Sequence, residues 1–227
     1  MNRRLSALDK ITLISNSDAH SPAKIGREAN IFDTEISYKA MMDALKSPLI
    51  PPLSKGGKGG LKKGGCGGFS GTIEFFPEEG KYHYDGHRLC KTSLSPKETI
   101  KHNYLCPVCG KKVTVGVMHR VERLADREEG FELKGAPPFK SIIPLPEIIA
   151  EILKVGVNSK KVNNEYQNLL QKLGSEFKIL MDAPLDEIER AGSPLLREAI
   201  YMMRSGNVHI APGYDGEFGK VKIFDAG

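Results

Sequence analysis

The chain has 227 residues, of which 40% are hydrophobic and 27% charged, a composition typical of a globular protein rather than a disordered or fibrous one. At about 100–200 residues per domain, this length corresponds to one or two domains. Its longest apolar runs fall far short of the roughly 18 residues that indicate a membrane span, and its basic N-terminus leads into no apolar signal core. We therefore expect a cytoplasmic protein with no membrane partner.

The formal net charge of +5 arises from 33 Lys and Arg residues against 28 Asp and Glu residues. Five lysines and no acidic residue lie between Asp43 and Glu74, so the rest of the chain is formally neutral. Binding to DNA would therefore depend on local basic patches and not on bulk charge.

The first predicted elements are a short buried strand over residues 11–15, a polar turn over 16–22 and a helix over 38–45. In α/β units, the loop beyond the carboxyl end of a strand is where ligands and metals collect. Asp18 and His20 lie two residues apart in this loop, so in extended geometry both side chains can project towards one cation. A solvated aspartate beside a surface histidine is the alternative interpretation.

Residues 47–68 hold 8 of the 24 glycines and 3 of the 14 prolines and have no helical or strand periodicity. Such a segment cannot bury enough apolar surface to offset its backbone entropy, so we predict a flexible insertion over 47–70. Its Cys66 is left out of any metal site, because a mobile segment cannot preorganise a ligand. The G-x-x-x-x-G-K-[ST] order of a P-loop is absent here and at 216–221, which argues against an ATP-driven motor.

Three of the four cysteines fit a zinc template. His87 and Cys90 form one x2 pair, and after fifteen residues Cys106 and Cys109 form a second. Zinc takes four such ligands at tetrahedral corners, and each pair presents two of them to one ion. We therefore predict a structural zinc site in a small ribbon-like unit over 71–127, and nothing indicates the export that a disulfide would require. Other histidines close in sequence remain alternatives for the fourth ligand: His83, His102 and His119.

After Pro146 the apolar periodicity becomes helical. The sequence predicts one helix that starts at Pro146 and stops before Gly156, a second over 159–173, and a third that starts at Ser193 and is closed by Gly206. Serine and proline at a helix start, and glycine just past its end, are the usual start and stop signals. Residues 208–224 read as a hairpin with a glycine-containing turn.

Several segments resemble known families. Residues 15–22 (SNSDAHSP) and 26–30 (GREAN) resemble the last metal-binding motif of PHP-type (polymerase and histidinol phosphatase) metallohydrolases. The segments that resemble the zinc-binding part of endonuclease Q are 75–88 (FFPEEGKYHYDGHR), 106–111 (CPVCGK) and 119–127 (HRVERLADR). The match continues through 143–147 (IPLPE) and 213–219 (GYDGEFG) and covers nearly the whole chain apart from the insertion.

The resemblance implies a nuclease that nicks DNA on the 5′ side of deaminated bases such as uracil and hypoxanthine, and at abasic sites, with metals held in a PHP barrel. Family members join that barrel to a zinc domain and a helical C-terminal domain. We therefore expect a multidomain α/β protein. Its expected parts are a C-terminal edge of a PHP-type barrel over 1–46, the insertion over 47–70, a zinc-ribbon-like β domain over 71–140 and a helical domain with a terminal hairpin over 141–227.

The same resemblance assigns roles to individual residues. By position, Asp18 and His20 match the family's final metal ligands, so they are the expected catalytic residues and would help to hold Mg, Mn or Zn. The residues that match its structural zinc cluster are His87, Cys90, Cys106 and Cys109. Candidate phosphate contacts are Arg27, Lys81, Arg88 and Arg120, and Tyr214 is a candidate for base stacking. A solvated charge or a packed aromatic ring is an equally good interpretation of each of these five.

The early H-x-H pair and the middle His, Asp and Glu ligands of PHP barrels are absent from this sequence. We therefore expect at most a fragment of the active site, inactive alone: either a truncated endonuclease or one that another polypeptide completes. The expected partner is DNA that contains deaminated bases. Two rival hypotheses are a non-catalytic zinc-containing DNA-binding module and a structural zinc domain that docks a protein.

Overall fold

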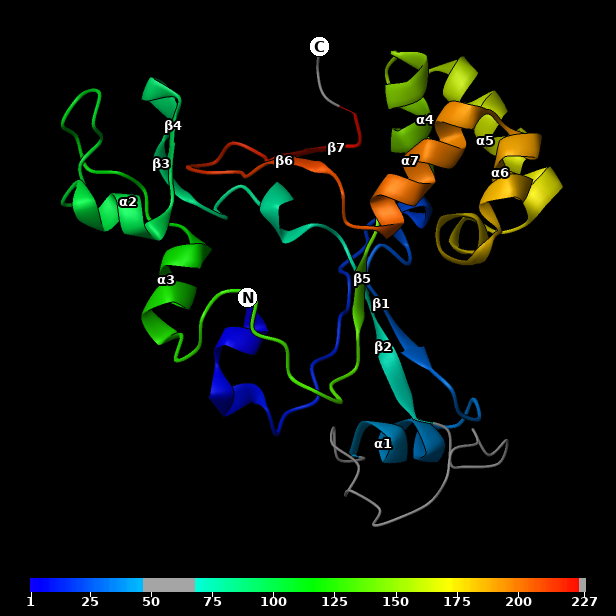
Figure 1. Cartoon of the computed structure of the whole chain (residues 1–227), viewed down its shortest axis with the longest axis horizontal. Helices are drawn as coiled ribbons and strands as arrows, with labels where there is room; N and C mark the ends of the chain where they lie inside the picture. The colour runs from blue at the N-terminus through cyan, green and yellow to red at the C-terminus, as the bar shows by residue number, and fades with distance from the viewer. Residues whose placement is uncertain (47–67, 225–227) are drawn as a thin grey trace.

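The computed structural model describes residues 1–46 and 68–224, which form a mixed α/β protein with small sheets and several helices (Figure 1). The predicted insertion lies almost entirely outside the described residues. Within the described part of the chain, no helix has the length and apolar character needed to cross a membrane.

A small sheet lies between two lobes of the molecule (Figure 1). Its strands are β1 (Ala29–Phe32), β2 (Phe69–Glu74) and β5 (Phe139–Ser141). The central strand β2 runs antiparallel to β1 and parallel to β5. The predicted helix over 38–45 is confirmed as α1 (Tyr38–Lys46), at the far end of this sheet. The expected domain boundaries at 70/71 and 140/141 fall within β2 and β5, so this sheet contains residues from all four expected parts.

The predicted strand over 11–15 does not form. At its last residue the backbone pairs with a side chain instead: Asn30 accepts from the amide of Ser15 at 3.0 Å and donates to its carbonyl at 2.8 Å. Ile11 and Ile14 are both about half exposed, so this segment is not buried as the prediction required. The strand near this position is β1, which lies fourteen residues further along the chain and carries Asn30.

One lobe is a helical bundle (Figure 1). Its helices are α4 (Leu145–Leu153), α5 (Lys160–Leu173), α6 (Leu185–Ala191) and α7 (Pro194–Arg204). The predicted helices are confirmed in α4, α5 and α7, and the side chains of Ser159 and Ser193 cap the last two. Helix α4 ends earlier than expected, because Lys154 adopts the left-handed conformation at φ 52°. Helix α6 and a π-helical turn over Lys178–Asp182 were not predicted.

The other lobe is a small unit around the cysteines, here called the zinc unit, which comprises residues 82–124. Its elements are the hairpin of β3 (Asp85–His87) with β4 (Thr92–Leu94), α2 (Pro96–Lys101) and α3 (Val117–Leu124). The expected ribbon-like unit contained no helices, so α2 and α3 were not predicted. The local core is very small: Leu94, Cys106 and Val113 are buried, and Cys90 packs against them.

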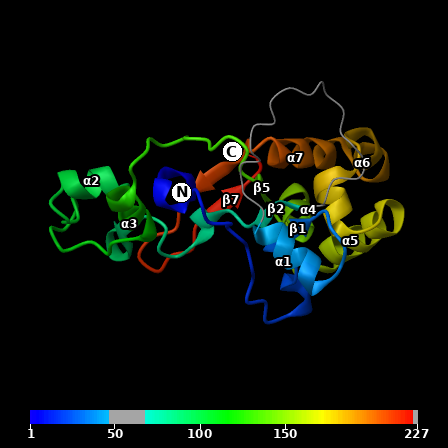
Figure 2. The same ribbon diagram turned by 90° about the horizontal axis from the view of Figure 1, so that it is seen from below.

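The predicted terminal hairpin is confirmed as β6 (His209–Ala211) paired antiparallel with β7 (Lys220–Lys222), and it extends from the bundle towards the zinc unit (Figures 1 and 2). Asp215 and Gly216 form its turn with φ of 44° and 87°, as a type I′ turn requires. Beyond β7, Ile223 is fully buried in the core of the bundle.

Candidate metal centre

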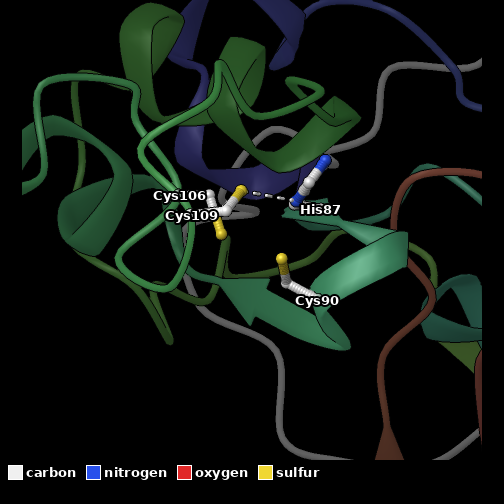
Figure 3. Close-up of side chains that lie close together, drawn as sticks. All are labelled: His87, Cys90, Cys106 and Cys109. Carbon is white, nitrogen blue, oxygen red and sulfur yellow. Dashed lines mark hydrogen bonds between the residues drawn. The ribbon is translucent and has the colours of Figure 1, made fainter.

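Two tight turns bring the predicted zinc ligands together (Figure 3). The first follows β3, where His87 leads into a 3₁₀ turn that carries Cys90 and ends at Lys91 in the left-handed conformation. The second is closed by Gly110, whose amide donates to the carbonyl of Cys106 at 2.8 Å. Gly110 has a φ of 70°, a conformation that glycine adopts without strain.

One ligand atom from each of His87, Cys90, Cys106 and Cys109 lies within 4.8 Å of the other three. The Nδ1 atom of His87 lies 3.4 Å from the Sγ atom of Cys109. Tetrahedral zinc, with Zn–S near 2.3 Å and Zn–N near 2.0–2.1 Å, would place such a nitrogen and sulfur about 3.6 Å apart. The geometry and the donor set therefore fit one metal ion, with Nδ1 as the ligand atom of His87.

Local hydrogen bonds make one thiol of this group unusually acidic. Burial alone would raise the pKa of Cys106, but hydrogen bonds from the backbone amides of Cys109 and Val108 outweigh it and lower the pKa to about 6. A hydrogen bond with Cys109, together with burial, raises the pKa of Cys90 to about 11. Because the thiolate is the form that binds metal, the second turn prepares Cys106 as a ligand.

The alternative histidines have other partners or lie apart from the group. His83 Nδ1 is 2.9 Å from the carbonyl of Pro77, and both ring nitrogens of His119 are engaged, with Asp85 and with Tyr104. His102 is exposed at the end of α2. In the described residues, His87 is therefore the histidine that joins the cysteines, whereas Cys66 lies outside them.

A buried polar network supports the zinc unit, and sequence reasoning missed it. Asp85 is fully buried and accepts from the amide of Gly116 at 2.7 Å and from Nδ1 of His119 at 2.8 Å. The hydroxyl of Tyr104 lies 3.2 Å from the other ring nitrogen of His119. These contacts tie β3 to α3. No local motif marks Asp85, because its partners lie more than thirty residues away.

Asp18 and His20 are exposed and line an open pocket of about 430 Å³. Carboxylates of Glu28, Glu79 and Glu147 line the same pocket. Burial, followed by repulsion from Glu147, raises the pKa of Glu79. Among the described residues, only the His87 cluster brings three or more His, Cys, Asp or Glu side chains into an arrangement that could hold a metal. Asp18 and His20 therefore contribute a pair of possible ligands and not a complete site.

The candidate DNA contacts have identifiable neighbours in the structure. Arg27 pairs with Glu176 of the bundle at 3.0 Å, and Lys81 lies over the ring of Phe218 at 4.4 Å. Tyr214 packs on Gly86, where an added Cβ would lie 2.5 Å from the tyrosine ring. Arg88 and Arg120 are exposed on the zinc unit, and Arg88 lies 3.9 Å from Glu217 of the hairpin. The roles of all five residues stay predictions.

The zinc unit carries a set of exposed basic residues, here called its basic surface, that the whole-chain charge count concealed. From Arg88 to Arg120 there are seven Lys and Arg residues and a single acidic residue, Glu98. All seven are exposed: Arg88, Lys91, Lys97, Lys101, Lys111, Lys112 and Arg120. Counting charge by unit, with the lysine-rich insertion set aside, would have found this surface from the sequence.

Comparison with protein families and curated proteins gives three matches. Residues 144–207 match a family model described as the MJ0043 C-terminal domain. The uncharacterized protein MJ0043 of Methanocaldococcus jannaschii is 31% identical over 224 residues, which is 95% of this chain and 26% of that protein. The uncharacterized protein YqxK of Bacillus subtilis is 27% identical over 98% of this chain and 49% of its own length. The chain thus spans about a quarter of one curated relative and half of the other.

Two solved structures superpose on nearly the whole of this chain. The lesion-specific endonuclease PfuEndoQ of Pyrococcus furiosus superposes with a TM-score of 0.80 at 29% identity, over 97% of this chain and 51% of that one. An endonuclease Q bound to a 27-mer duplex substrate, with an abasic lesion at its active site, superposes with a TM-score of 0.75 at 29% identity, over 98% and 52% of the two chains. The chain therefore matches the C-terminal portion of endonuclease Q, the family that its sequence motifs indicated.

Proposed function

We propose that this chain supplies the zinc-binding and DNA-engaging part of a repair endonuclease of the endonuclease Q type. The observation that carries the proposal is the exposed basic surface around a cluster fit for a structural zinc ion, in a fold that matches nucleases acting on damaged DNA. Zinc in this role is structural, because four protein ligands leave no open coordination position for a substrate.

The pocket at Asp18 and His20 is proposed to form one edge of a PHP-type hydrolytic site. In a complete site these two residues would help to hold Mg, Mn or Zn, and such cations activate water and neutralise charge on the phosphate. Two-metal hydrolysis needs more ligands than this pair, so we propose that a second polypeptide or further sequence supplies the rest. The 227-residue chain alone should then bind DNA without nicking it.

A binding titration tests the DNA-engaging role. Fluorescence anisotropy with a labelled duplex that carries one abasic site should show binding that weakens steeply with salt, because phosphate contacts release counterions. Arg88→Gln/Arg120→Gln should lower both the affinity and the salt slope. Lys160→Gln/Lys161→Gln, at two exposed positions on α5 of the bundle, removes the same charge away from the zinc unit and serves as the control for a general change in charge. Failure of the wild-type chain to bind would favour a zinc unit that docks a protein.

A nicking assay tests the hydrolytic edge. Zinc-replete chain with Mg²⁺ or Mn²⁺ would be incubated with duplexes that carry one uracil, one hypoxanthine or one abasic site. We expect no nicking by the chain alone, and nicking once the missing ligands are provided, with loss of activity in Asp18→Ala. Nicking by the chain alone that Asp18→Ala abolishes would show that our set of ligands is incomplete. Nicking that survives Asp18→Ala would refute the role of this pocket.

A further inference from the structure

The two metal-binding turns each expose a large apolar side chain at the same position. Leu89 is the third residue of the His87–Cys90 turn and is 81% exposed, and Val108 is the third residue of the Cys106–Cys109 turn and is 69% exposed. Neither side chain contributes to the small core of the zinc unit. The four candidate ligand side chains lie within 4.8 Å of one another, so a bound metal would fix the spacing of the two turns that carry Leu89 and Val108.

Basic residues flank these apolar tips. Arg88 and Lys91 are adjacent to the first turn, and Lys111 and Lys112 follow the second. All four are exposed, and no acidic residue occurs within either turn. Arg88 alone has acidic neighbours from the hairpin, because Glu217 lies 3.9 Å from its side chain and Asp215 accepts from its amide. An apolar projection with a cationic rim suits a polyanion that also offers an apolar interior, and stacked base pairs behind a phosphate backbone provide both.

We propose that Leu89 and Val108 form a wedge that inserts between bases of DNA, while the surrounding lysines and arginines hold the adjacent phosphates. This inference rests on the proposed DNA-binding function and specifies how the zinc unit would engage the duplex. Insertion of apolar side chains unstacks a base step and costs the least where stacking is already weakened, as beside a missing base. The wedge would therefore favour damaged or locally opened DNA over an intact duplex.

A protein partner is the competing occupant of an exposed apolar tip. The charge pattern favours DNA, because the segment from Arg88 to Arg120 carries seven exposed basic residues and one acidic residue. The hairpin adds Glu217, which lies 3.9 Å from Arg88 and pairs with that one arginine. An acidic protein could match the charge but would not respond to the loss of a base. A comparison of damaged with intact duplex therefore distinguishes DNA from a protein as the occupant.

The experiment uses the full zinc-loaded chain and two duplexes of equal length and charge, one intact and one with a single abasic site beside 2-aminopurine. Binding of the wild-type chain should raise 2-aminopurine fluorescence in the abasic duplex, because the wedge unstacks that base. Leu89→Ser/Val108→Ser should weaken binding to the abasic duplex about tenfold, the scale of one buried aliphatic side chain. It should also abolish the fluorescence rise and leave the salt slope unchanged.

Controls separate the wedge from folding and from charge. Ile36→Ser/Tyr38→Ser removes two exposed apolar side chains near α1, far from the zinc unit, and should change nothing. Lys111→Gln/Lys112→Gln should reduce the salt slope by about one per residue. If the serine variant loses its zinc, Leu89→Gln/Val108→Thr replaces it and should give the same loss of affinity and fluorescence.

Each outcome decides between the two proposals. Equal affinity and an equal fluorescence rise for the wild type and the polar-tip variant would overturn the wedge and leave DNA binding standing. A loss of affinity that is the same on intact and abasic duplexes would also overturn insertion at weakened steps. Failure of the wild-type chain to bind either duplex would overturn the proposed function and the wedge together.

Discussion

Removal of the metal should unfold the zinc unit and leave the helical bundle folded. The physical reason is the size of the two cores. The bundle core includes Leu145, Ile148, Leu169, Ile179 and Ile200, all fully buried. The zinc unit buries Leu94 and Val113 beside Cys106, which is itself a proposed ligand.

The burial of Leu94 and Val113 contributes about 3–6 kcal/mol at about 1.5–3 kcal/mol for each side chain. A structural zinc ion of this ligand type contributes about 10–16 kcal/mol of folding free energy near neutral pH. The metal therefore supplies more of the stability of the zinc unit than its apolar core does. The predicted ribbon-like unit over 71–127 includes β2, but β2 belongs to the central sheet and should survive metal loss.

Hydrogen exchange measured by mass spectrometry, with and without a chelator, tests this prediction. Amides of residues 85–114 should lose protection after chelation, and those of 145–204 should keep it. Cys109→Ser should reproduce the effect of chelation in zinc-replete buffer, because this exposed cysteine contributes little packing. Val113→Ala should cost about 1.5 kcal/mol but retain protection, since the metal stays bound. Unchanged protection of 85–114 after confirmed metal removal would refute the reasoning.

Three further changes test the packing around the site. Asp85→Ala leaves the Gly116 amide and His119 Nδ1 without their acceptor, so chemical denaturation should show a loss of about 1–3 kcal/mol for each unsatisfied group; an unaltered midpoint would contradict it. In Gly219→Ala the new Cβ would lie 2.0 Å from the Glu78 carbonyl oxygen, so thermal melts should show destabilisation of about 1–3 kcal/mol. In Gly206→Ala the new Cβ meets no atom, so that variant tests only the backbone strain of a positive φ. Burial and Glu147 raise the pKa of Glu79, so its contribution to stability is present at acid pH and is lost as the pH rises through that pKa. Glu79→Gln should therefore raise the unfolding free energy at pH 7 and give no such gain in stability below about pH 4. An equal gain in stability at both pH values would contradict the raised pKa of Glu79.

Local signals in the sequence were enough to predict the metal-binding turns and much of the bundle. The x2 spacings of His87–Cys90 and Cys106–Cys109 fix geometry within a few residues, so no long-range information was needed. Ser159 and Ser193 likewise cap helices through amides only three residues away. Interactions of this range are encoded in adjacent sequence.

Long-range interactions explain what could not be predicted. The buried pair of Asp85 and His119 joins residues 34 positions apart, and nothing in the local pattern distinguishes it from a surface pair. The apolar run over 11–15 resembles a buried strand, but the side chain of Asn30 takes both backbone hydrogen bonds of Ser15 instead. An apolar pattern reports that a segment can be buried and does not say which partner it will meet.

The terminal hairpin gives the GYDGEFG segment a structural role that links the two candidate sites. Asp215 accepts from the amide of Arg88 at 2.7 Å and from the hydroxyl of Thr114, so the tip of the hairpin is fixed to the zinc unit. The amide of Gly219 donates at 3.0 Å to the carbonyl of Glu79, a residue that also lines the pocket of Asp18 and His20. At its other end, the amide of Ile223 is bound by Glu151 of α4. One short hairpin thus contacts the zinc unit, the acidic pocket and the bundle, and it would hold the basic surface at a fixed position relative to the proposed hydrolytic edge.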